Sequence, residues 1–364
     1  MPTFDRVDQI LRDAVPEVAP AAQLDIRWRG DPVFARVVGY LDPETRQRPV
    51  RADTRFDLAS VTKLFVTAAF MRQVESGAVT LETPVSALLP AFSGLRPIGP
   101  YEDPLQTGQF ITVAEGGSVD AGATTFRQLL THTSGLPAWR PLFKQPDAAA
   151  ARALALATHF AYRPGTRVIY SDIGLILLGL ALEFLTGLPL EVAVRQGVTD
   201  PLGLHHTGYC PALDVVCAPT EICAWRGRRV DGEVHDENAA RLGGVSGHAG
   251  LFATAADLAG FGQSFLDGSL LHRETVAEMT REQALDGTLR RGLGFQLWSP
   301  EPEASGYPFG PRAFGHTGFT GTSLWIDPER ELVVALLTNR VYHGRVPAGI
   351  TRLRVALHRA VVGA

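Results

Sequence analysis

Residues 55–70 read RFDLASVTKLFVTAAF and place Ser60 at the start of an apolar segment, with Lys63 three residues later. The apolar run predicts a helix, and positions i and i+3 share a helix face, so the two side chains can come within hydrogen-bond distance. A serine hydroxyl attacks a carbonyl only if a neighbour takes its proton, which a lysine with a destabilised ammonium can do. The backbone N–H of a serine at a helix start is also free to point at a developing oxyanion. One turn could therefore hold both parts of an acyl-transfer site.

The pair alone does not decide between a catalytic site and an ordinary helix start. A chain of 364 residues should contain on the order of one S-x-x-K by chance. In the simpler interpretation, Ser60 caps the helix while Lys63 is solvated. Further segments are needed to choose.

Two later segments supply them. The triplet YSD, residues 170–172, lies between a short β-like run and a strongly apolar helix, and the triplet HTG, residues 316–318, opens a predicted strand. Tyr170 could accept or donate a proton if a nearby cation lowers the pKa of its hydroxyl. The glycines around HTG allow close approach of a ligand to the backbone, where the N–H of Phe319 could be a second oxyanion donor.

In this order, SVTK, YSD and HTG resemble the motifs of the serine β-lactamase and penicillin-binding-protein superfamily, in particular its class C-like branch of esterases, peptidases and amidases. That family carries S-x-x-K, then Y-x-N, then a K-T-G or H-T-G strand. The phrases LLTHTSGLP and GHAGLFATAADLAGF also look like its connecting segments. The resemblance covers nearly the whole chain from about residue 25.

The resemblance implies an acyl-enzyme cycle without metal or cofactor: acylation of Ser60, then hydrolysis. Lys63 and Tyr170 would share the proton of Ser60, and the N–H groups of Ser60 and Phe319 would form the oxyanion hole. The residues expected to line the substrate site are Asp172, His316, Thr317 and Gly318.

Two positions depart from the family pattern. Asp172 replaces the usual asparagine, and a carboxylate beside Lys63 favours the ammonium, which moves the role of general base toward Tyr170. Alternatively, Asp172 points elsewhere and holds the helix start. His316 replaces the lysine that anchors a β-lactam carboxylate and is fully charged only below its pKa. Esters or amides are therefore the expected substrates, unless His316 is merely structural.

A further segment, RGRRVDGEVHDENAARLGGVSGHAG at residues 226–250, concentrates polar side chains. It has neither the spacing nor the helical His-x-x-x-His of a metal site, which leaves a solvated loop or a wall of the substrate cleft. The phrase most resembles serine amidases that cut between N-acetylmuramic acid and its peptide. Another histidine, His132 in LLTHTSGLP, is expected in the last turn of a helix, where a cationic side chain suits the dipole. The polar residues of the segment are His235, Asp236, Glu237, Asn238 and His248.

The two ends of the chain predict strands. Residues 24–40 predict two strands around a Gly-Asp turn, and residues 321–340 predict two more joined by DPER, before a helix at 348–362. The expected fold is α+β and β-lactamase/transpeptidase-like: an antiparallel sheet built from both chain ends, flanked by helices, with a mainly helical inserted region. Residues 1–75 and 225–364 would form the α/β body and 76–224 the helical region, with the active site between them.

Composition limits the possible partners. The net charge is −4, and 45% of residues are apolar, so a soluble protein is expected, with neither nucleic acid nor an anionic membrane as partner. The amino terminus lacks the apolar stretch of a secretory signal, which predicts a cytoplasmic location. The substrate should be a small molecule or peptide; the oligomeric state is left open. Two other functions compete with a muropeptide hydrolase: a broad carboxylesterase with weak β-lactamase activity, and a non-catalytic protein that binds peptidoglycan fragments.

Overall fold

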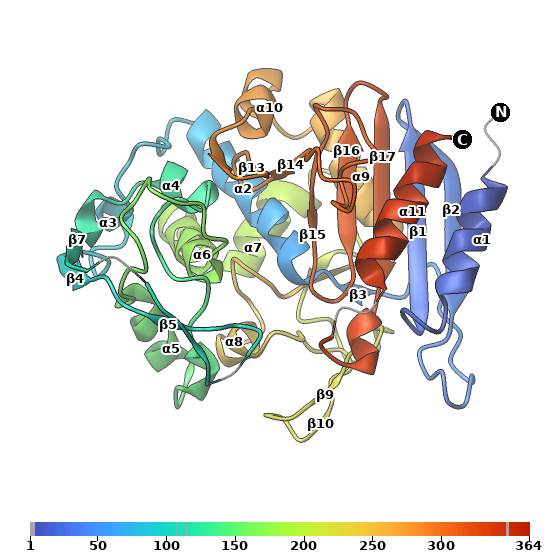
Figure 1. Ribbon diagram of the computed structural model, residues 1–364, viewed down its shortest axis with the longest axis horizontal. Helices are drawn as coiled ribbons and strands as arrows, with labels where there is room; N and C mark the ends of the chain where they lie inside the picture. Colours follow the sequence, from blue (N-terminus) through green and yellow to red (C-terminus); the bar gives the residue numbers. More distant parts are fainter. Residues whose placement is uncertain (1–3, 107, 114–115, 347–348) are drawn as a thin grey trace.

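The computed structural model describes residues 4–106, 108–113, 116–346 and 349–364. Its centre is an eight-stranded antiparallel sheet in which both ends of the chain meet, as predicted (Figure 1). The N-terminal strands β1 (Ala21–Trp28) and β2 (Asp31–Gly39) extend the sheet beyond β17 (Leu332–Thr338). The remaining strands, from the outer edge inward, are β12 (Ala284–Asp286), β13 (Leu289–Arg291), β14 (Gln296–Leu297), β15 (Phe314–Thr317) and β16 (Ser323–Asp327).

Alternation along β17 explains why the sheet is covered on both faces. Residues 333, 335 and 337 pack into the main core, whereas residues 334 and 336 pack into a second core on the opposite face. Helices α1 (Asp5–Ala14) and α11 (Ile350–Val362) cover the second core, and α9 (Ala255–Asp267) covers the main one. In α9, Gly262 is required, since a Cβ there would lie 2.7 Å from a methyl of Val333.

The predicted helix after Ser60 is a core element. A 3₁₀ turn (Ala59–Val61) leads from β3 (Phe56–Asp57) into α2 (Thr62–Glu75), and residues 62–71 of α2 are all buried. A helix that is buried all round must be surrounded by protein, and α2 contacts both α6 (Asp172–Thr186) and α7 (Leu190–Val194). Ser60, in the turn that precedes α2, therefore adjoins the main core.

The sequence predicts helix starts at Thr125, with Gln128 three residues later, and at Thr254, with Asp257 three residues later, and the structure has both. The side chain of Thr125 accepts from the N–H of Gln128, whose side chain accepts from the N–H of Thr125, a complete capping box for α4 (Phe126–Leu130). Thr254 likewise caps α9. The remaining helices are α3 (Val85–Leu88), α5 (Ala148–Leu156), α8 (Glu237–Arg241) and α10 (Arg273–Thr280), with a π-helical turn (Arg195–Thr199) after α7 and 3₁₀ turns at Ala121–Ala123, Leu142–Lys144 and Arg340–His343.

Residues 93–124, which look like a long loop in the sequence, contain paired short strands. Residues 107, 114 and 115 of this segment lie outside the described part, as does residue 348 of the predicted last helix. The domain boundaries at 75/76 and 224/225 stay predictions. The short strands form four small ladders: β4 (Leu95–Pro97) with β7 (Ser118–Asp120), β5 (Tyr101–Glu102) with β6 (Phe110–Ile111), β9 (Ile222–Cys223) with β10 (Arg228–Arg229), and β11 (Leu251–Ala253) between β3 and β8 (Gly208–Tyr209).

Within the described ranges, no single helix is long and apolar enough to cross a membrane. Helix α6 passes such a test only together with residues 190–199, across a bend of 79°. The apolar side chains of α6 instead pack in the main core.

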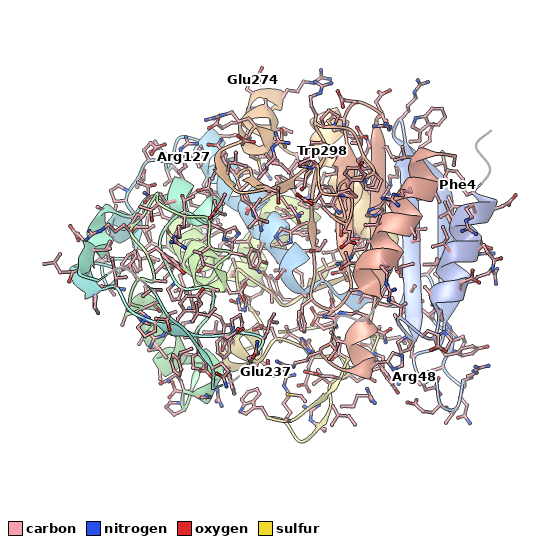
Figure 2. All side chains as sticks on the ribbon, viewed as in Figure 1. Phe4, Arg48, Arg127, Glu237, Glu274 and Trp298 are labelled. Atoms are coloured by element: carbon pink, nitrogen blue, oxygen red, sulfur yellow. The ribbon has the colours of Figure 1, made fainter. Side chains whose placement is uncertain are left out.

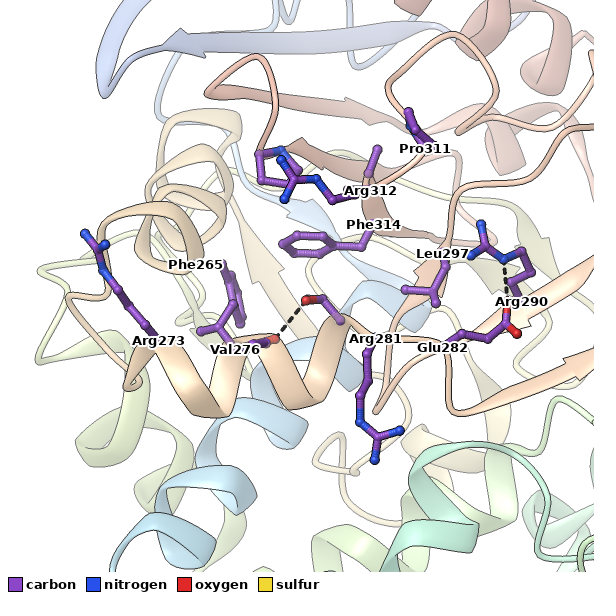
Figure 3. A pocket seen from close by; sticks show the side chains of 14 residues that line it. Phe265, Arg273, Val276, Arg281, Glu282, Arg290, Leu297, Pro311, Arg312 and Phe314 are labelled. Carbon is purple, nitrogen blue, oxygen red and sulfur yellow. Dashed lines mark hydrogen bonds and ion pairs between the residues drawn. The ribbon is translucent and has the colours of Figure 1, made fainter.

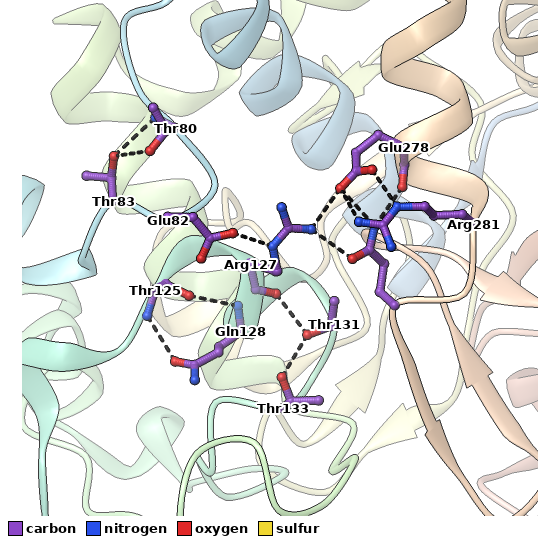
Figure 4. Close-up of polar contacts among 11 residues, drawn as sticks. Thr80, Glu82, Thr83, Thr125, Arg127, Gln128, Thr131, Thr133, Glu278 and Arg281 are labelled. Carbon is purple, nitrogen blue, oxygen red and sulfur yellow. Dashed lines mark hydrogen bonds and ion pairs between the residues drawn. The ribbon is translucent and has the colours of Figure 1, made fainter.

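Arg127 joins the helical side to the sheet body (Figures 2 and 4). Its guanidinium donates to Glu82 before α3, and to Glu278 and Gln283 at the end of α10, with distances of 2.8 Å to each of the last two. Glu278 also accepts two hydrogen bonds from Arg281. The hydrogen bonds from Arg281 and Arg127 lower the pKa of Glu278 to about 2, although partial burial works against them.

We expect Glu278→Gln to lower the free energy of unfolding at pH 7 by about 1–2 kcal/mol, because a carboxylate held by two guanidiniums becomes a neutral amide. The folded-state pKa is depressed, so this stabilisation is present above about pH 4.5 and is lost as the pH falls toward 2. Denaturant unfolding at several pH values measures the difference between wild type and variant. The control is Glu274→Gln on the same helix (Figure 2); an equal loss in both variants would contradict the role of the junction.

Candidate active site

Ser60 is held at a sharp turn by the buried carboxylate of Asp57. One oxygen of Asp57 accepts from the N–H of Ala59 at 2.7 Å, and the other accepts from the N–H of His235 at 2.6 Å. Ala59 has φ of 46°, a left-handed conformation that costs a non-glycine residue energy. The turn leaves the half-buried Ser60 accessible at the start of α2.

Lys63 is almost completely buried and has three acceptors for its three N–H bonds. Its Nζ donates to Ser60 Oγ at 2.8 Å and to the carbonyl of His248 at 3.0 Å, and it pairs with Asp172 Oδ1 at 2.9 Å. Burial works to lower the pKa of Lys63, but the negative charge of Asp172 outweighs it and leaves the pKa above its usual value. Lys63 is therefore an ammonium, and Asp172 faces it rather than pointing elsewhere.

Tyr170 lies against this ammonium. Lys63 Nζ is 4.9 Å from the centroid of the tyrosine ring, and the phenol oxygen is shut off from water without a hydrogen-bond partner in the described part of the chain. Burial raises the pKa of Tyr170, and Lys63 opposes this only in part. Tyr170 is thus a neutral phenol close to Ser60 and Lys63.

The turn after HTG packs directly against the turn that carries Ser60. The hydroxyls of Thr320 and Thr322 donate to the carbonyls of residues 57 and 58, at 2.7 and 2.9 Å. Gly318 permits this approach, since a Cβ there would lie 2.5 Å from the carbonyl of residue 58. Phe319 follows in the turn, and its ring stacks on His235. The segments with the two expected oxyanion donors, Ser60 and Phe319, are therefore neighbours.

His316 is buried beside the same cluster and is uncharged. Its Nδ1 lies 2.8 Å from the carbonyl of Thr317, which can only accept, so Nδ1 carries the proton. Burial, then the positive charges of Lys63 and Arg291, hold the pKa of His316 well below its usual value. His316 therefore cannot act as the cation that a lysine would supply at this position.

Within the segment 226–250, the polar side chains of residues 235–238 and 248 form a buried or half-buried network, whereas residues 227, 228, 231 and 233 are exposed. His248 Nε2 lies 2.9 Å from Asp236, and its Nδ1 lies 2.8 Å from the hydroxyl of Ser246. Asn238 binds the backbone of residues 140 and 143, so α8 is tied to the loop after α4. Glu237 accepts from Arg345, and His235 pairs with Glu221. No group able to hold a metal ion occurs among the described residues. The network contacts the site through the carbonyl of His248.

Sequence reasoning missed one residue of the cluster, Arg291, and misplaced another, His132. Arg291 at the end of β13 is buried, its Nε has no hydrogen-bond partner in the described ranges, and its guanidinium carbon lies 5.4 Å from the centroid of the Tyr170 ring. The sequence offers no signal for it, because β13 is only three residues long. His132 was expected in a helix turn as a cation. It lies beyond the end of α4, buried against Tyr170, and burial followed by Arg291 and Lys63 depresses its pKa well below the usual value.

A pocket of about 650 Å³ lies elsewhere, between α9, α10 and the beginning of β15 (Figure 3). Its walls combine apolar side chains such as Phe265 and Phe314 with Arg273, Arg281, Arg290 and Arg312. None of the residues around Ser60 and Lys63 lines it, so this cluster and the pocket are separate features.

Comparison with known proteins assigns the family. Residues 7–358 match the Beta-lactamase family model, and the chain belongs to that family. It is 33% identical to the N-acetylmuramyl-L-alanine amidase of Bacillus subtilis (strain 168), over 92% of this chain and 80% of that protein. It is 32% identical to a putative D-alanyl-D-alanine carboxypeptidase of Salmonella typhi, over 80% of this chain and 71% of that protein.

Solved structures share the fold at lower identity. EstCE1, a hydrolase with promiscuous acyltransferase activity, superimposes with a TM-score of 0.76 at 22% identity and covers 98% of this chain and 97% of its own. A penicillin-binding-protein homologue from Caulobacter crescentus gives 0.74 at 20% identity, covering 99% and 97%. The fold is thus β-lactamase/transpeptidase-like, and the chain is a β-lactamase-related serine hydrolase, the class expected for an acyl-enzyme reaction on an ester or amide.

The buried pair of Lys63 and Asp172 predicts strong energetic coupling. Asp172→Asn should lower the free energy of unfolding by about 2–4 kcal/mol, because it leaves a buried ammonium without a counter-charge. In a Lys63→Met background the same change should cost less than about 1 kcal/mol, which a double-mutant cycle by denaturant unfolding measures. Equal losses in both backgrounds would show that the pair is not coupled.

Proposed function

We propose that the protein hydrolyses the amide that joins N-acetylmuramic acid to its peptide, through an acyl-enzyme on Ser60. The observation that carries the proposal is the 2.8 Å hydrogen bond from buried Lys63 to Ser60 Oγ, with Tyr170 against the same ammonium. The substrate class is supported by the amidase of Bacillus subtilis, which is similar over 92% of this chain. A protein that only binds peptidoglycan fragments has no need of these three side chains together.

The proposed proton path runs from Ser60 through Lys63 to Asp172. Since Lys63 is already an ammonium, it can take the serine proton only while passing one of its own to the carboxylate, 2.9 Å away. The Ser60 oxygen then bonds to the carbonyl carbon, and the oxyanion lies between the N–H groups of Ser60 and Phe319. The sequence favoured Tyr170 as the base; its raised pKa makes the tyrosinate scarce and argues instead for Tyr170 as the acid.

In this scheme Tyr170 gives its proton to the leaving amine as the C–N bond breaks. The tyrosinate then recovers a proton from Asp172 by way of Lys63, which restores the resting state. Water hydrolyses the acyl-enzyme by the same groups in reverse. Each proton is accounted for within the cluster, so the scheme uses no metal and no cofactor.

A broad carboxylesterase is the second candidate. The observation in its favour is the neutral, buried His316, which supplies no positive charge to hold a substrate carboxylate. An uncharged ester suits such a position. A panel of p-nitrophenyl esters, nitrocefin and MurNAc-peptides compared by kcat/KM ranks the two candidates; preference for MurNAc-peptides supports the amidase.

Ser60→Ala should abolish both covalent labelling by a fluorophosphonate and turnover of MurNAc-L-alanyl peptide. Intact mass spectrometry after incubation measures the adduct. The control is Ser76→Ala, an exposed serine at the other end of α2, which should label as wild type does. A wild-type protein that forms no adduct across the pH range would falsify the role of Ser60.

Substrates that differ in leaving group separate Lys63 from Tyr170. Lys63→Ala should slow all substrates by about 10²–10⁴-fold, the usual range for general acid–base groups. Tyr170→Phe should cost a similar factor with amides but less than about tenfold with p-nitrophenyl esters, whose leaving group needs no proton. An equal loss on both substrates would assign Tyr170 to activation of Ser60 instead.

A further inference from the structure

His132 contacts the ring of Tyr170 and the backbone of both neighbouring residues. Its backbone carbonyl accepts from the N–H of Ile169 at 2.8 Å, and its ring nitrogen Nδ1 accepts from the N–H of Ser171 at 3.1 Å. The imidazole itself packs on the phenol, with ring centroids 4.7 Å apart. One residue thus holds the residue before Tyr170, the residue after it, and its ring.

The backbone at His132 is bent to make this possible. Its φ is 59°, at the position after a helix end where glycine is the usual residue. A non-glycine side chain in this conformation carries a cost of about 1 kcal/mol or more. The flanking Thr131 and Thr133 bond to each other through their hydroxyls at 2.8 Å, which supports the turn (Figure 4). The chain therefore has a histidine at a position where glycine would adopt the backbone conformation with less strain.

The segment that carries Tyr170 needs this support. Residues 163–171 lie between regular elements and belong to no strand, contrary to the β-like run expected from the sequence. On the other side, Ser171 donates to the carbonyl of Pro137 at 2.6 Å, and the N–H of Asp172 donates to Ala138. These contacts fix residues 171 and 172, whereas His132, in the described part of the chain, bonds to residue 169 and packs on the ring of residue 170.

The tautomer of His132 is also determined. An N–H donates to Nδ1, so Nδ1 carries no proton and Nε2 carries it. Protonation of Nδ1 would place two donors face to face and break the bond to Ser171. It would also add a charge beside Lys63 on α2 and Arg291 on β13, with His316 on β15 close by. His132 can thus hold Tyr170 only as the neutral Nε2–H form.

We propose that His132 is the positioning residue of Tyr170 and keeps the phenol oriented for proton transfer. This rests on the proposed function only in requiring that Tyr170 takes part in the reaction. His132 acts on the reaction only through Tyr170. Its contribution belongs to kcat, because it orders a group that acts in the transition state.

Three substitutions separate its contacts. His132→Asn keeps an acceptor near the Nδ1 position and tolerates positive φ, His132→Phe keeps a ring, and His132→Ala keeps neither. His132→Ala should lower kcat about 10–100-fold with KM changed less than about threefold, and Asn and Phe should each recover part of the loss. The control is His159→Phe; this half-buried histidine hydrogen-bonds, in the described part of the chain, only to the carbonyl of Pro100, and the variant should behave as wild type.

The decisive measurement is a double-mutant cycle with Tyr170→Phe. If His132 acts through the phenol, His132→Ala in the Tyr170→Phe background should lower kcat less than about threefold. A loss as large as in the wild-type background, or an unchanged kcat in His132→Ala alone, would overturn the proposal. Melting temperatures distinguish a general loss of stability, which would appear equally in both backgrounds.

Two substrates keep the tests independent. MurNAc-L-alanyl peptide tests the proposed substrate, and ethyl butyrate, whose alkoxide also needs a proton on leaving, tests the cluster without it. If the protein turns over ethyl butyrate but not the muropeptide, the amidase assignment is wrong. The double-mutant cycle of His132→Ala and Tyr170→Phe is then measured on the ester. Wild-type kcat for His132→Ala on both substrates would remove the positioning role and leave the amidase assignment intact.

Discussion

The rest of the structure depends on one buried charge, the ammonium of Lys63. Moving such a group out of water costs several kcal/mol unless each N–H finds an acceptor. The three acceptors come from the turn before α2, from the first residue of α6, and from the carbonyl just before β11. Three segments far apart in the chain must therefore meet at one atom, and the site exists only in the fully folded protein.

This constraint explains why polar networks lie so deep in the protein. Asp57 accepts from the N–H groups of both Ala59 and His235, which ties the turn of Ser60 to the segment that leads to His248. Asp236 pairs with His248 and caps α8. Removal of either carboxylate would leave buried donors without partners. The network fixes the positions of the reacting groups, but it requires several carboxylates to be buried, which costs desolvation free energy.

The sequence predicted the features that local patterns encode. The strands at 24–40 and 321–340, the caps at Thr125 and Thr254, and the juxtaposition of Ser60 with Lys63 follow from alternation, capping and helical spacing. The environment of Tyr170 could not be predicted in this way. Arg291 and His132 reach it from 121 and 38 residues away along the chain, and neither lies in a pattern that indicates chemistry. The same holds for the short strands within 93–124, whose pairing depends on tertiary contacts.

Because both ends of the chain meet in one sheet, the sheet can be completed only after the last strands have been synthesised. Ala21 donates to the side chain of Asn339, 318 residues later, and β1 pairs with β17 along its length. At about 5–20 residues per second, a ribosome needs on the order of tens of seconds to make the intervening chain. During that interval β1 can pair with β2 but not with β17, and the turn of Ser60 lacks the turn after β15 that packs against it. The nascent chain therefore cannot complete the site until its last strands emerge, and the edge of β1 that later pairs with β17 stays open to other strands until then.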